Sequence, residues 1–123
     1  MIIGINSGLS NNTSFGITLH KTKELKTIAK LAQKQGKQQY FDNAVNLLKL
    51  SPLEGDVLVT AGKIKTNDNI KSYSSIFMIT PQKELKTSKI TSNATNNPIE
   101  LALNHFLEIN DKNSSLFKTL FSN

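Results

Sequence analysis

The sequence contains no arginine, no cysteine and no tryptophan, and its positive charge comes from 15 lysines among 123 residues. A guanidinium can hold a carboxylate, a phosphate or a guanine edge with two parallel hydrogen bonds, whereas an ammonium acts as a point charge. The lack of arginine therefore limits the basic surface to diffuse attraction. The lack of cysteine excludes disulfides, thiolate zinc sites and cysteine nucleophiles in this chain.

The composition, with 37% apolar and 20% charged residues, predicts a single globular domain over residues 1–123. No stretch approaches the ~20 apolar residues that cross a bilayer, so we expect no membrane span. Residues 1–19 carry no charged side chain and lack the pattern of a secretory signal, which predicts a cytoplasmic protein. Their composition also resembles the export segments of flagellar or type III secretion substrates, which implies signal-peptide-independent export as the alternative.

Several segments alternate between apolar and polar residues with the period of a β-strand. Residues Met1–Ile5 and Phe15–Leu19 are predicted to form a hairpin of two short strands. The β-branched run that starts at Gly55 predicts a third strand, and Ile70–Thr80 predicts a fourth. Lys83–Thr91 alternates weakly and suits an edge strand protected by lysines.

Between the second and third predicted strands the apolar period becomes helical. Thr22–Gln35 carries one apolar stripe, and a second stripe that ends near Lys49 lies on the opposite side of any single straight helix. Gly36 separates the two stripes and is costly inside a helix, which predicts an αα-hairpin. Asn97 and Pro98 are suited to begin a C-terminal helix. The predicted fold class is α+β, an antiparallel sheet of about five short strands with an inserted αα-hairpin and one or two C-terminal helices.

A row of lysines on the first predicted helix is the candidate site for an anionic partner. These side chains fall within about 80° of arc, opposite the apolar stripe. Like charges four residues apart repel each other, so such a row is easiest to understand if an anionic partner lies on it. The alternative is a solvated helix face in a lysine-rich chain. The row consists of Lys23, Lys26, Lys30, Lys34 and Lys37.

The αα-hairpin also resembles the helix-turn-helix motif of DNA-binding proteins. Ala32 and Gly36 match the small residue and the turn glycine of that motif. Gln35, Lys37 and Asp42 stand where the family has apolar packing residues, so we expect Asp42 not to pack against the first helix. Because arginine is absent, reading of guanine edges is weakened. Nucleic-acid binding by this chain would therefore be nonspecific.

Catalytic side chains are scarce. His105 and Glu108 lie three residues apart on one predicted helix, but no second histidine or carboxylate at fixed spacing completes a metal site. An isolated histidine on a partly apolar helix is more often packed and hydrogen-bonded than catalytic, with a hydrolytic or metal site around His105 as the alternative. We expect no enzyme, no metal and no cofactor.

The C-terminal segment has a two-turn apolar face. This face either folds back onto the sheet or acts as a docking element or dimer contact. We therefore predict a small non-enzymatic accessory or adaptor protein that binds another protein, with a homodimer as one form of that binding. The alternative is a nonspecific nucleic-acid-binding protein that uses the lysine row. The candidate residues for protein interaction are Leu116, Phe117, Leu120 and Phe121.

Overall fold

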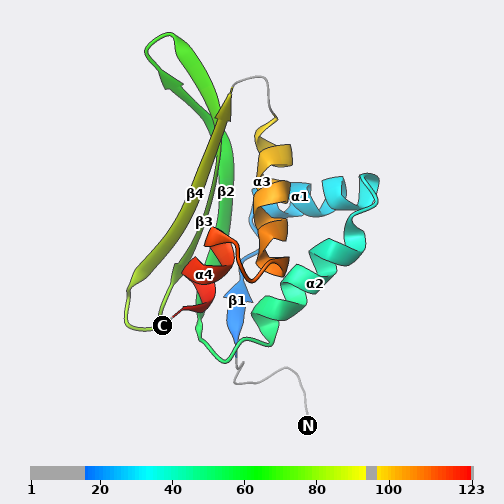
Figure 1. Cartoon of the computed structure of the whole chain (residues 1–123), viewed down its shortest axis with the longest axis vertical. Coiled ribbons are helices and arrows are strands. Elements are labelled where there is room, and N and C mark those ends of the chain that lie inside the picture. The colour runs from blue at the N-terminus through cyan, green and yellow to red at the C-terminus, as the bar shows by residue number, and fades with distance from the viewer. Residues whose placement is uncertain (1–15, 94–96, 123) are drawn as a thin grey trace.

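The computed structural model describes residues 16–93 and 97–122, which form a sheet with helices on one side (Figure 1). In the described part, no helix is both long and apolar enough to cross a membrane. The elements in chain order are β1 (Ile17–Leu19), α1 (Lys23–Lys34), α2 (Gln38–Lys49), β2 (Gly55–Thr66), β3 (Asn69–Ile79), β4 (Leu85–Asn93), α3 (Pro98–Leu107), a 3-10 turn (Glu108–Asn110) and α4 (Ser115–Phe121).

The sheet contains four described strands in the order β1-β2-β3-β4. β1 pairs with β2 in parallel, while β2 with β3 and β3 with β4 pair in antiparallel fashion. The predicted α+β class is confirmed, but the predicted antiparallel sheet of five strands is not accurate. The αα-hairpin acts as a crossover, so β2 runs in the same direction as β1. The predicted strand Met1–Ile5 lies outside the described residues.

The predicted αα-hairpin is present, and its geometry follows from local signals. Thr22 caps α1, because its hydroxyl oxygen accepts a hydrogen bond from the Leu25 amide at 3.2 Å. The same hydroxyl donates to the Val59 carbonyl at 3.2 Å and so fixes the start of α1 to β2. Gly36 adopts a φ of +71° between the two helices, in the left-handed region that favours glycine.

The α3 helix packs on the inner face of the sheet, against β2 and β3 (Figure 1). Asn97 caps it as predicted, accepting a hydrogen bond from the Ile99 amide at 2.9 Å, and Pro98 is its first residue. Leu103 and Phe106 are fully buried beneath it. The Phe106 ring also meets the ring of Phe41 on α2, with centroids 5.1 Å apart, which joins the αα-hairpin to the same core.

The sheet has two different faces, because side chains alternate along each strand. The inner face is covered by the helices and includes the buried residues Val57, Val59, Ile76 and Met78. The outer face is covered by none of the described helices (Figure 1).

We predict that two glycine substitutions differ in cost. Gly36→Ala should lower the free energy of unfolding by about 1 kcal/mol, because the backbone is left-handed but nothing lies within 4 Å of the new methyl group. Gly16→Ala should cost more, about 3 kcal/mol, because φ is +116° and the methyl carbon would lie 2.2 Å from the Lys49 carbonyl oxygen. Urea unfolding of both variants checks the order, and equal costs would contradict it.

Candidate binding surfaces

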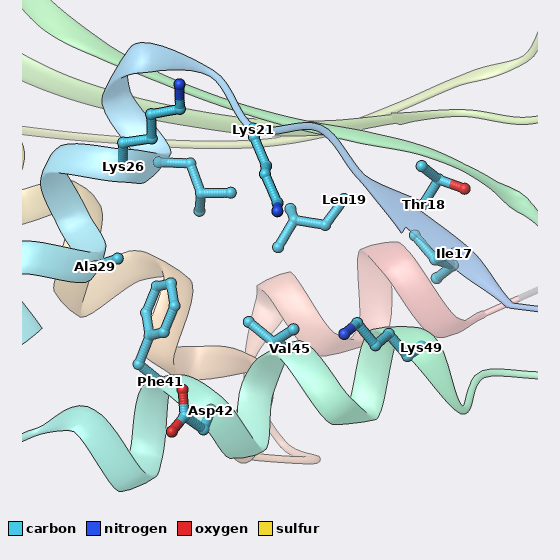
Figure 2. A pocket seen from close by; sticks show the side chains of 11 residues that line it. Ile17, Thr18, Leu19, Lys21, Lys26, Ala29, Phe41, Asp42, Val45 and Lys49 are labelled. Carbon is cyan, nitrogen blue, oxygen red and sulfur yellow. The ribbon is translucent and has the colours of Figure 1, made fainter. Parts of the chain in front are cut away.

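A groove of about 700 Å³ lies between β1, α1 and α2 (Figure 2). It exists because α1 and α2 meet at Gly36 and spread apart toward β1, the edge strand of the sheet (Figure 1). Its floor is apolar and continuous with the protein core. The floor is formed by Ile17, Leu19, Leu25, Ala29, Phe41 and Val45.

The rim of the groove is mostly basic. Lys21, Lys26 and Lys49 stand around it with one carboxylate, Asp42. Figure 2 shows the Lys21 and Lys49 side chains reaching over the floor from opposite walls, whereas the amine of Lys26 points away. Asp42 is exposed, as expected, and accepts a hydrogen bond from the Gln38 side-chain amide at 2.8 Å. The groove therefore combines an apolar floor with a net positive rim.

The lysine row on α1 is largely as predicted. Lys23, Lys26, Lys30 and Lys34 are all exposed on this helix. In the described part of the chain the one ion pair joins His20 to Asp56, so none of these four ammonium groups is paired with a described carboxylate.

The fifth predicted member of the row, Lys37, lies apart from the other four. It follows the turn at Gly36 as the cap residue of α2, and its side chain is half-buried. Its amine donates to the Asn104 side-chain oxygen on α3 at 3.4 Å. The row on the α1 surface therefore has four members.

The predicted C-terminal interaction face is divided by the fold. Leu116 and Leu120 are fully buried in the core, because α4 packs against β4 and the 3-10 turn with this row facing inward. Phe117 and Phe121 are half-buried and pack on each other with ring centroids 4.5 Å apart. Two of the four residues are therefore inaccessible to a partner, and the face mainly closes the core.

His105 is completely buried between α3 and the sheet. Its Nδ1 lies 2.7 Å from the Ser74 hydroxyl and its Nε2 lies 3.0 Å from the Ser88 hydroxyl. A neutral imidazole has one donor and one acceptor nitrogen, so one serine accepts and the other donates. Burial lowers the pKa of His105 from 6.5 to about 4. This side chain is packed and hydrogen-bonded on both sides.

Glu108 would accompany His105 in the alternative metal-site hypothesis; its pKa is raised, first by burial and second by the nearby charge of Asp111. Within the described ranges, no three histidine or acidic side chains come together as a metal site. The geometry around His105 therefore supports a structural role.

The outer face of the sheet is the surface that the sequence reasoning missed. The strand register places Leu58 opposite Phe77 and Ile79 opposite Leu85 on this face. Leu58 and Phe77 are half-buried, while Ile79 is 37% and Leu85 is 64% exposed. We call this surface the open face; its apolar members are Leu58, Ile64, Tyr73, Phe77, Ile79 and Leu85.

A signal for the open face was present in the sequence of β3. An antiparallel strand with one solvated face should alternate between apolar and polar residues. In β3, however, Ile76 and Met78 point inward while Phe77 and Ile79 point outward. The sequence of β3 therefore predicts an apolar surface on the outer face of the sheet as well as on the inner face.

Comparison of the chain with protein-family models, curated proteins and solved structures gives no match.

Burial of His105 predicts a specific loss of stability in acid. The folded protein favours the neutral imidazole, so this contribution is fully present above pH 6.5 and is lost as the pH falls toward 4. A pKa lowered to about 4 corresponds to about 3 kcal/mol at full effect. The free energy of unfolding, measured in urea at pH 7 and pH 4, should fall by this amount more than in a His105→Gln variant. Parallel pH profiles for the two proteins would contradict this assignment.

Proposed function

We propose that this chain is a non-enzymatic accessory protein that binds a protein partner through the open face of its sheet. The observation that carries the proposal is the apolar surface of β2, β3 and β4 that none of the described helices covers (Figure 1). Contiguous apolar patches on a protein surface mark interaction sites more often than scattered apolar residues do. A second copy of the chain is one partner that fits this proposal.

The composition of the open face supports a partner that is itself a folded surface. Phe77 and Leu58 lie side by side on neighbouring strands and offer a central apolar contact. Thr60, Thr87 and Lys89 are on the same face and supply polar groups around that centre. An apolar centre with a polar rim is the usual organisation of a protein interface. Sheets also pack against other sheets through such flat faces.

We expect the double variant Leu58→Thr, Phe77→Thr to weaken partner binding at least tenfold, because central apolar residues contribute most of the binding energy. Threonine is favourable in strands, so the sheet should persist. The measurement is affinity capture from native lysate with nuclease present, combined with sedimentation velocity to detect self-association. Leu50→Thr is the matched control, since Leu50 is 81% exposed but lies at the end of α2, away from the open face. Identical captured proteins and identical sedimentation for wild type and double variant would refute the proposal.

The α1 lysine row supports nonspecific nucleic-acid binding as a second candidate function. Four exposed ammonium groups without described ion-pair partners lie on one helix. Each phosphate contact releases counterions, so binding that uses this row must weaken as salt concentration rises.

For this second function we expect replacement of Lys23, Lys30 and Lys34 by glutamine to reduce the slope of log affinity against log salt by about 2.7 for duplex DNA. In the matched control, three exposed lysines of the β2–β3 hairpin are replaced by glutamine, which removes the same charge elsewhere. They are Lys63, Lys65 and Lys71. Fluorescence anisotropy over a salt series measures both slopes. Equal slopes in the two triple variants would show that the row has no special role.

A further inference from the structure

We propose that the groove between β1, α1 and α2 binds a single-chain amphiphile that has an apolar tail and an anionic carboxylate head, such as a fatty acid. This site is separate from the open face and does not depend on the proposed protein partner. Its volume of about 700 Å³ lies within the range of about 300–1,000 Å³ that is usual for small-molecule sites.

The floor of the groove suits an aliphatic tail. Ile17, Leu25 and Phe41 are buried in the core cluster and present an apolar surface at the base. Ala29 and Val45 are half-buried and form the facing walls on α1 and α2. Because the side chain of Ala29 is small, it leaves space between the α1 wall and the α2 wall. Thr18 is the one uncharged polar residue of the lining, so shape and apolar contact must do most of the selection of a ligand.

The rim of the groove suits a single negative charge. Lys21, which follows β1, and Lys49, at the end of α2, reach over the floor from opposite sides (Figure 2). Neither forms an ion pair with a described carboxylate. Asp42 is the one acidic residue of the lining and lies on α2 one turn before Val45. The head of the ligand therefore belongs between Lys21 and Lys49, with the tail directed toward Ala29 and Phe41.

The dimensions of the groove favour a small ligand over a helix of a partner protein. β1 has three residues, which span about 10 Å. The α2 wall from Phe41 to Lys49 spans about 12 Å. A partner helix that lay along these walls could contact them over only about two turns, at about 5.4 Å for each turn. A single alkyl chain can lie on the floor.

The first test is a chain-length series with the full-length protein. Isothermal titration calorimetry with octanoate, decanoate and dodecanoate, each below its micelle concentration, should show about a fourfold gain in affinity for each buried methylene group. Dodecanol should bind about fivefold more weakly than dodecanoate, because it lacks the charge that Lys21 and Lys49 attract. Equal affinity for dodecanol and dodecanoate would overturn the proposal. Dodecyl phosphate and anionic phospholipid vesicles serve as further arms, and preference for either one would also overturn it.

The second test is the double variant Lys21→Gln, Lys49→Gln, which should weaken dodecanoate binding about fivefold and leave dodecanol binding unchanged. Lys83→Gln, Lys112→Gln is the matched control, since both residues are exposed and removed from the groove. An equal loss in both double variants would show a net-charge effect and overturn the proposal.

Amide chemical shifts locate the ligand. Dodecanoate should perturb amides of β1, α1 and α2 and leave those of Leu58 and Phe77 on the open face unchanged, which separates this proposal from the proposed function. Perturbation centred on the open face would refute the groove as the site. Failure to bind any member of the series would also refute the proposal.

Discussion

The packing of α3 across the inner face of the sheet determines the rest of the structure. Leu103 and Phe106 are fully buried, so this helix occupies the centre of the inner face. Beside it, α1 packs against both α3 and β2, and α2 is joined to α3 by the contact between Phe41 and Phe106. The described helices all lie on one side of the sheet and leave its other side uncovered, and α1 and α2 border the groove beside β1 (Figure 1).

Polar and apolar residues are distributed in an unusual way between the two sides of the sheet. Ser74 and Ser88 are buried on the inner face and are satisfied by His105, whereas Leu58 and Phe77 lie on the outer face. Burying hydroxyl and imidazole groups is tolerated only when each finds a partner. Cross-strand pairs such as Leu58 with Phe77 add to the stability of the sheet, but they leave Ile79 and Leu85 exposed to solvent. Departures from the expected pattern that stability does not explain are concentrated at functional surfaces.

The parts of this fold that sequence could predict are those fixed by neighbouring residues. The turn at Gly36, the cap at Asn97 and the lysine row of α1 depend on local geometry, and the structure has them. The direction of β1 relative to β2 depends on where the crossover returns the chain. The prediction that this strand pairs in antiparallel fashion was therefore wrong. Periodicity marks Leu116 and Leu120 as one apolar face, but it cannot tell whether that face turns toward the core. The groove forms only where β1, α1 and α2 come together, and no local sequence pattern predicts such an arrangement.

A surface built with lysine alone places limits on how it can select a ligand. Ammonium groups attract any anion and impose little geometry, since they lack the planar fork of a guanidinium. Charge on α1 can therefore raise the local concentration of anionic partners without choosing among them. Selectivity for one ligand must therefore come from the shape of an apolar surface. A lysine can contribute to such selectivity only where it borders an apolar cavity. Lys21 and Lys49 meet that condition at the groove. Lys30 and Lys34, on the exposed α1 surface, do not line it. Lysines thus stand in two different settings, one beside an apolar floor and one on an exposed helix surface.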